Sequence, residues 1–137
     1  MPWGSGMTAH MDSAVRLGRI GQIAGTVRDL DRSVAFYRDI LGIPYLFGVP
    51  GMAFFDCAGV RLMLSKGEKP EENYNSILYF KVDDIHNMRG ELGGRGVEFE
   101  REPHLVARMP DHDLWMAFFR DPERNLLALM SEVRRSS

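Results

Sequence analysis

The sequence is poor in cysteine, in excess charge and in long apolar runs, and each shortage excludes a class of protein. Cys57 is the only cysteine, so the chain has no disulfide framework and no thiolate metal cluster. A formal net charge of −2 gives no basic surface for nucleic acid. No apolar run approaches the roughly 20 residues of a membrane span, and the N-terminus lacks the basic start and apolar core of a signal peptide. We therefore expect a cytoplasmic protein that binds neither nucleic acid nor membrane.

The composition is otherwise that of an ordinary folded domain. The 137 residues are 45% hydrophobic and 26% charged, which suffices for one buried core. Residues 1–18 mix Gly, Pro and Ser with isolated apolar residues, and we expect a flexible tail there. Residues 19–134 are expected to form a single domain.

The first module, residues 19–66, begins with a strand in which Gln22 and Ala24 share one face, while Ile23 and Val27 share the other. A helix follows, with an aspartate as its N-cap and a glycine at its end. Its apolar residues recur at helical spacing and form a stripe that packs on the strand. The rest of the module is predicted as three strands, at 44–49, 52–57 and 60–65.

A polar segment with Gly and Pro, residues 67–75, is expected to link this module to a second one at residues 76–132. The second module repeats the order of the first, because Val27-Arg28-Asp29-Leu30 lines up with Val82-Asp83-Asp84-Ile85. Each half therefore reads β-α-β-β-β, with a longer loop predicted at 101–113. A duplication of this size is a strong indication of the fold.

Two stretches, VRDLDRSVAFYRDILGI at 27–43 and FFRDPERNLLALM at 118–130, resemble the signature stretches of the vicinal oxygen chelate superfamily. This superfamily includes glyoxalase I, extradiol dioxygenases, methylmalonyl-CoA epimerase and bleomycin-binding resistance proteins. The resemblance covers residues 19–132 and implies an α+β, glyoxalase-like fold. In that fold two βαβββ modules form a cupped mixed sheet, with helices outside and the ligand inside, and the chain is a homodimer. No single activity is implied, since one fold hosts lyases, isomerases, oxygenases and binders.

Metal-using members of the superfamily hold their ion with four cup-facing residues, commonly His in the first strand and Glu in the last strand of each module. The corresponding residues here are Gln22, Met63, Ile77 and Ala128. Amide, thioether and aliphatic side chains do not hold a divalent ion tightly, because such an ion requires carboxylate oxygen or imidazole nitrogen. The resemblance therefore leads us to expect no metal and no other cofactor.

Alternation within the strands predicts which side chains line the cup. Gln22 is expected to be the main polar group, because its amide offers both a hydrogen-bond donor and an acceptor. The other predicted lining residues are mostly apolar: Ile20, Ala24, Met63, Ile77, Tyr79, Trp115, Leu126, Ala128 and Met130. The alternative is that side chains fill the cup and that Gln22 only bridges two strands.

The predicted loop at 101–113 holds further candidate residues. Two histidines and two aspartates in this loop can in principle bind a metal or form an acid–base pair, although the aspartates are also typical of a solvated turn. Loops over a cavity often carry function. We therefore predict that His104, Arg108 and His112 contact the ligand at the mouth of the cup.

Two classes of function remain open. The first is a metal-free protein that binds a small, largely apolar molecule, as resistance-type members of the superfamily sequester drugs. The alternative is a lyase, isomerase or dioxygenase-type enzyme. Such an enzyme would use non-standard metal ligands, or metal-free acid–base chemistry through Gln22, Tyr79 and the loop histidines.

Overall fold

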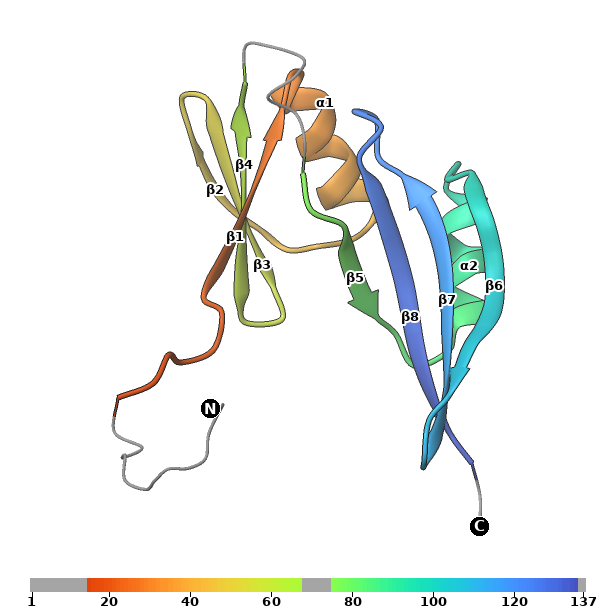
Figure 1. Ribbon diagram of the computed structural model, residues 1–137. Coiled ribbons are helices and arrows are strands. Elements are labelled where there is room, and N and C mark those ends of the chain that lie inside the picture. Colours follow the sequence, from red (N-terminus) through yellow and green to blue (C-terminus); the bar gives the residue numbers. More distant parts are fainter. Residues whose placement is uncertain (1–14, 68–74, 136–137) are drawn as a thin grey trace.

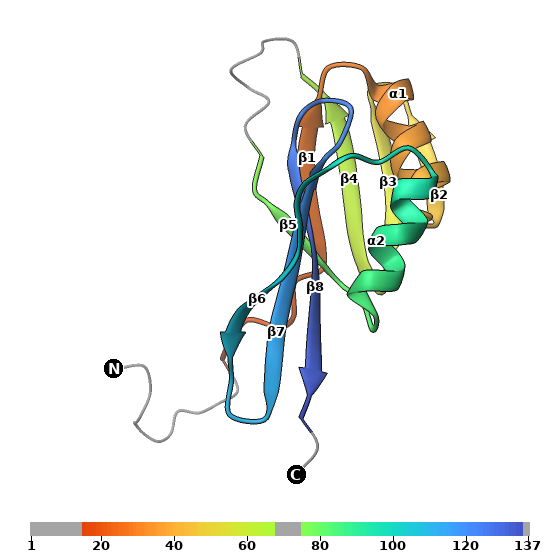
Figure 2. The same cartoon turned by 90° about the vertical axis from the view of Figure 1, so that its right-hand side faces the viewer.

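The computed structural model describes residues 15–67 and 75–135, so most of the predicted tail and of the predicted linker lies outside the described residues. The chain forms two four-stranded mixed sheets, and strands β1 and β5 lie where the two sheets meet (Figure 1). Both helices lie on one side of these two strands (Figure 2). In the described part of the chain, no helix is long and apolar enough to cross a membrane.

The first module contains β1 (Gln22–Val27), β2 (Tyr45–Val49), β3 (Met52–Cys57) and β4 (Val60–Lys66), in the order β1-β4-β3-β2. β1 runs parallel to β4, and the other pairs are antiparallel. The helix α1 (Leu30–Ala35) continues into the π-helical turn η1 (Phe36–Ile40). The backbone N–H of Arg32 donates to the Asp29 carboxylate at 3.1 Å, and Gly42 has a positive φ of 75°. The predicted N-cap and the predicted glycine end are therefore both confirmed.

The second module contains β5 (Leu78–Lys81), α2 (Ile85–Gly94), β6 (Phe99–Arg108), β7 (His112–Arg120) and β8 (Leu126–Arg134), with strand order β5-β8-β7-β6. β5 runs parallel to β8, as β1 does to β4. Asp84 caps α2 by accepting the backbone N–H of Asn87 at 3.0 Å. The α+β class and the two βαβββ modules are confirmed.

The predicted loop at 101–113 is wrong, because β6 continues to Arg108 and β7 begins at His112. β6 pairs with β7 through three shifts of register, so the ladder continues although the alternation of side chains is broken. Pro103 has no N–H to donate, and it is tolerated because β6 is the outer strand of its sheet. His104 and Arg108 therefore lie on a strand.

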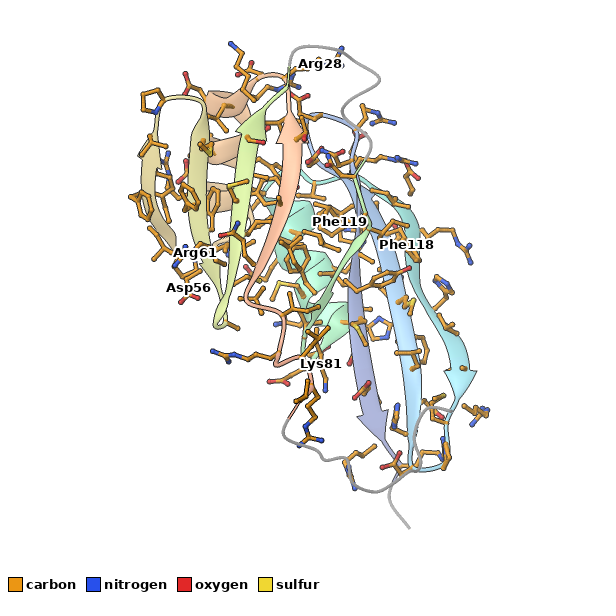
Figure 3. The ribbon with its side chains drawn as sticks, turned by 60° about the vertical axis from the view of Figure 1, so that its left-hand side comes forward. Arg28, Asp56, Arg61, Lys81, Phe118 and Phe119 are labelled. Atoms are coloured by element: carbon orange, nitrogen blue, oxygen red, sulfur yellow. The ribbon has the colours of Figure 1, made fainter. Side chains whose placement is uncertain are left out.

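One hydrophobic core is shared by the two helices and by the helix-facing side of both sheets. Phe119 of β7 is fully buried in this core, while its neighbour Phe118 leaves the strand toward the opposite side (Figure 3). Because successive residues of a strand alternate, each sheet keeps a second face that its helix does not cover. We call these outer face one (Gln22, Ala24, Phe54, Met63) and outer face two (Tyr79, Met116, Phe118, Ala128, Met130).

Candidate functional site

Outer face two gathers aromatic and apolar side chains from three strands. Tyr79 of β5 and Phe118 of β7 flank Ala128 of β8 in the register of the sheet. The rings of Tyr79 and Phe118 meet edge to face with centroids 6.1 Å apart, and the His104 ring lies 6.3 Å from that of Phe118. Tyr79 is 45% exposed in the single chain. The structure therefore brings the predicted residues Tyr79, His104, Ala128 and Met130 to one face of one sheet.

Outer face one carries the predicted polar group. Gln22 is exposed, and its Nε2 lies 4.0 Å from Sδ of Met63, which is a weak contact. Ala24 is the register partner of Met63, so these three predicted residues are neighbours. The ring of Phe54 stacks on that of Phe47 with centroids 4.6 Å apart. This face thus combines an apolar surface with an amide whose hydrogen-bonding capacity is largely unused.

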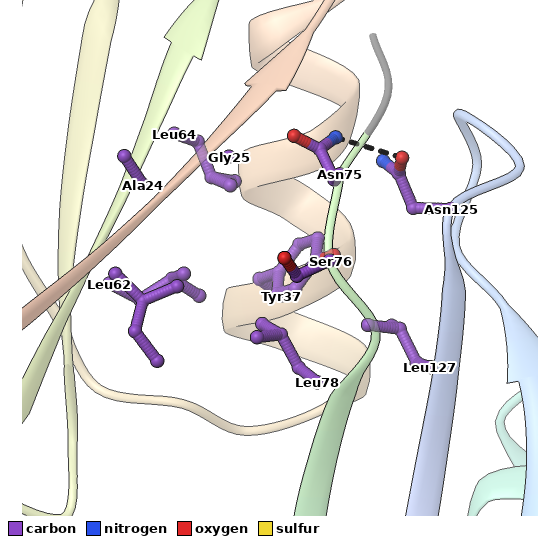
Figure 4. Close-up of a pocket in the computed structure, with 11 residues that line it drawn as sticks. Ala24, Gly25, Tyr37, Leu62, Leu64, Asn75, Ser76, Leu78, Asn125 and Leu127 are labelled. Carbon is purple, nitrogen blue, oxygen red and sulfur yellow. Dashed lines mark hydrogen bonds between the residues drawn. The ribbon is translucent and has the colours of Figure 1, made fainter.

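Two of the pockets where the modules meet are lined mainly by residues from the helix-facing sides of the sheets. The first, of about 60 Å³, lies beside Tyr37, Asn75 and Asn125 (Figure 4). It is far smaller than the roughly 300 Å³ at which small-molecule sites begin. The second, which we call the β4–β5 groove, has a volume of about 310 Å³ and an apolar lining. Its lining residues are Ile23, Cys57, Val60, Arg61, Leu62, Ile77, Leu78, Tyr79 and Phe80.

The four residues that correspond to the superfamily's metal ligands do not fit a divalent ion. Gln22 and Met63 are adjacent on outer face one, Ala128 lies on outer face two, and Ile77 precedes β5. Their amide, thioether and aliphatic groups include neither carboxylate nor imidazole. Within residues 15–67 and 75–135, no group of three or more His, Cys, Asp or Glu is placed to hold a metal ion.

A chain of charged and titratable groups borders outer face two, and we call it the rim cluster (Lys81, Asp111, His112, Glu132). His112 Nδ1 lies 2.7 Å from Asp111, and its Nε2 lies 3.9 Å from Glu132, which in turn contacts Lys81 Nζ at 3.0 Å. The hydrogen bond from His112 lowers the pKa of Asp111, and that from Lys81 lowers the pKa of Glu132. This arrangement can bind a polar group or transfer a proton at the edge of an apolar surface. His112 is therefore brought to the border of the predicted site.

Two other predicted contacts lie elsewhere. Trp115 faces the core and packs edge to face against the His86 ring of α2 at 5.4 Å, so its predicted position in the cup is wrong. Trp115 shares the core side of β7 with Ala117 and Phe119. The sequence did not reveal this side, because residues 115–119 are all apolar and show no alternation. Arg108 is exposed at the end of β6, where the β6–β7 turn begins. Its Nη1 lies 3.8 Å from the carboxylate of Asp113.

Sequence reasoning missed the polar network that joins the modules. The Asp121 carboxylate, in the turn between β7 and β8, accepts the hydroxyl of Tyr37 at 2.7 Å. Burial, and then the charge and hydrogen bond of Asp121, raise the pKa of Tyr37. Asn75 donates a hydrogen bond to Asn125 (Figure 4). It also exchanges two hydrogen bonds with the backbone of Thr26. The only signal in the sequence was a concentration of turn-forming residues at 121–125.

Comparisons with known proteins are consistent with this geometry. The family model of the Glyoxalase/Bleomycin resistance protein/Dioxygenase superfamily matches residues 19–129. The uncharacterized protein YraH of Bacillus subtilis is 31% identical, over 79% of this chain and 94% of that protein. A lactoylglutathione lyase structure from Agrobacterium tumefaciens has a TM-score of 0.67 and 23% identity, covering 85% of this chain and 95% of that one. Virulence protein STM3117 of Salmonella typhimurium has a TM-score of 0.71 and 18% identity, covering 87% and 100%.

Proposed function

Since the chain belongs to the glyoxalase/bleomycin resistance protein/dioxygenase superfamily, we propose that it binds a small, largely apolar molecule without a metal ion. The observation that carries this proposal is the open aromatic surface around Tyr79 and Phe118 on outer face two. Concave apolar surfaces with a few polar groups are the usual form of small-molecule sites. A ligand gains chiefly by removing this surface from water, and the neighbouring thioethers adapt to its shape.

In this proposal the site forms between two copies of the chain, with outer face one of one copy opposite outer face two of the other. Gln22 and Tyr79 are both open to solvent in the single chain. β1 and β5 each end a sheet, and unpaired sheet edges are normally covered. A two-fold arrangement covers them and yields two identical sites. The Gln22 amide then orients the ligand, because it offers one donor and one acceptor group.

A second candidate function is metal-free acid–base catalysis at the rim cluster. The observation that favours it is the short contact between Asp111 and Nδ1 of His112, which leaves Nε2 of the ring as the proton-transfer atom. The reaction class would be proton removal from an acidic C–H or O–H of the bound molecule, with His112 as the base. Lys81 would stabilise the negative charge that develops on the substrate.

The experiment is a thermal-shift and native-mass screen of aromatic and polyketide-like compounds on the wild type and on the Gln22→Ala and Tyr79→Ala variants. We expect hits that stabilise the wild type and that bind each variant about tenfold more weakly. Glu98→Ala, an exposed change on another part of the surface, is the control. The proposal is refuted when no compound stabilises the wild type, or when hits bind all four proteins equally.

The same hits separate the two candidate functions. A binding protein returns each compound unchanged, as mass spectrometry after prolonged incubation would show. An acid–base enzyme converts a compound, or exchanges its acidic hydrogen for deuterium in heavy water. In that case His112→Asn should abolish exchange while the compound still binds, because asparagine keeps polarity but does not act as a base.

A further inference from the structure

The segment that precedes β1, residues 15–20, exposes nearly all of its apolar surface, and we call it the N-terminal arm. Val15 is 94% exposed, Leu17 is 96% exposed and Ile20 is 65% exposed. The arm has no helix or strand structure of its own. Apolar side chains that follow each other in this way without a partner are typical of a segment that is buried on association.

The β4–β5 groove offers an apolar surface beside the base of this arm. The arm joins the sheet at Gly21, whose carbonyl accepts the backbone N–H of Arg61 at 2.9 Å, and Arg61 itself lines the groove. Cys57, Val60 and Ile77 make the groove apolar. In the single chain this groove has a free volume of about 310 Å³. An apolar segment without a partner and an apolar groove therefore lie next to each other.

The arm does not lie in the groove of its own chain, since Leu17 is almost fully exposed. The arm leaves the start of β1, and the edge strands β1 and β5 lie where the two sheets meet (Figure 1). A two-fold axis beside the start of β1 would carry each arm toward the groove of the other copy, because a two-fold interface is self-complementary. The arm also carries Arg16 and Arg19 and no acidic residue, whereas the exposed Asp83 follows β5.

We propose that the N-terminal arm of one copy binds in the β4–β5 groove of a second copy, and that the arm of the second copy binds in the groove of the first. Leu17 is the central apolar contact of this exchange. The interaction goes beyond the proposed ligand site on the outer faces of the sheets, and Tyr79 borders both the groove and that site. It makes the arm a determinant of dimer stability.

Leu17→Asp tests the exchange without disturbing the fold, because the Leu17 side chain is exposed. Size-exclusion chromatography with light scattering should give the wild type about twice the 15.6 kDa chain mass. We expect Leu17→Asp to raise the dissociation constant of the dimer at least about tenfold. The matched control is Gly90→Asp, which adds the same charge at an exposed position of α2 outside the arm, where an added Cβ meets nothing within 4 Å. A monomeric wild type, or equal dissociation constants for the two variants, would overturn the proposal.

A cross-link identifies the groove directly, because Cys57 lines it. Under mild oxidation, Leu17→Cys should give a disulfide-linked dimer, and this dimer should disappear when Cys57→Ser is added. A disulfide within one chain would show that the arm folds into its own groove. A linked dimer that survives Cys57→Ser would show that two arms meet each other instead. Either of these two results overturns the proposal.

Ligand binding is measured separately, so the two proposals can fail independently. A wild type that binds no compound but forms the Cys57-dependent cross-link refutes the proposed function alone. The arm exchange alone is refuted if the wild type binds compounds but Leu17→Asp and Gly90→Asp dimerise equally well.

Discussion

The hydroxyl of Tyr37 donates a hydrogen bond of 2.7 Å to the carboxylate of Asp121, and this bond joins the helical segment of the first module to a turn of the second. Both residues are 3% exposed. The other oxygen of Asp121 accepts the backbone N–H groups of Glu123 and Asn125, each at 2.9 Å. One aspartate therefore shapes the turn and also ties the modules together.

Tyr37→Phe should destabilise the protein by about 1–3 kcal/mol, because it removes a buried donor and leaves an oxygen of Asp121 with one partner fewer. Urea denaturation of wild type and variant measures this free energy of unfolding. Tyr45→Phe is the matched control, since Tyr45 is 39% exposed, and we expect it to change stability by less than about 0.5 kcal/mol. Equal losses for the two variants would contradict a special role for the Tyr37–Asp121 bond.

The same bond predicts a loss of stability in alkali. The folded protein holds the pKa of Tyr37 above its ordinary value of 10.0, because burial and Asp121 disfavour the phenolate. Above that pH the unfolded chain releases the Tyr37 proton and the folded chain keeps it. The unfolded chain then binds fewer protons, so the free energy of unfolding falls as pH rises.

This pH effect is measured as a difference between two proteins. From about pH 8 to about pH 11, the wild type should lose more stability than Tyr37→Phe, because other groups that titrate are common to both. The difference between their free energies of unfolding should therefore shrink at high pH. A constant difference over this range would show that Tyr37 ionises equally in the folded and unfolded chains.

Glu123 links the same turn to the start of the first helix. Its carboxylate accepts the backbone N–H groups of Arg28 and Asp29 at 3.0 Å and 2.7 Å, and its side chain is only 5% exposed. Glu123→Gln replaces one acceptor oxygen by an NH₂ group that faces a donor, and it should cost about 1–3 kcal/mol. Glu98→Gln, at an exposed position, is the control and should be neutral. Thermal denaturation compares the two, and a neutral Glu123→Gln would refute this link.

We expect the purified protein to carry no stoichiometric divalent metal, because Gln22, Met63, Ile77 and Ala128 replace the imidazole and carboxylate ligands of metal-using relatives. Elemental analysis after exposure to zinc, nickel, manganese or iron, followed by exhaustive dialysis, measures the bound ion. The double variant Gln22→His, Met63→Glu restores two candidate ligands on adjacent strands of one face and should retain more metal than the wild type. One tightly held equivalent in the wild type would contradict the expectation.

The sequence alone predicted the two modules, the N-cap and glycine end of the first helix, and the faces of β1. It succeeded because these features rest on local rules, namely the alternation of a strand, an aspartate that accepts a helix N–H, and a glycine at positive φ. The same rules predicted that Tyr79, Ala128 and Met130 share a face. They failed for Trp115, since an apolar run does not show which of its sides is buried.

Only the tertiary structure decided the contacts between segments that are far apart in the chain. Neither Tyr37 nor Asp121 carries a local signal for the other, and Asn75 lay within a stretch predicted as a linker although it binds Thr26 and Asn125. The course of β6 was likewise hidden, because its register shifts depend on pairing with β7. Local patterns specify the faces of single elements, whereas the position of one module against the other follows from complementary polar groups that meet only after both have folded.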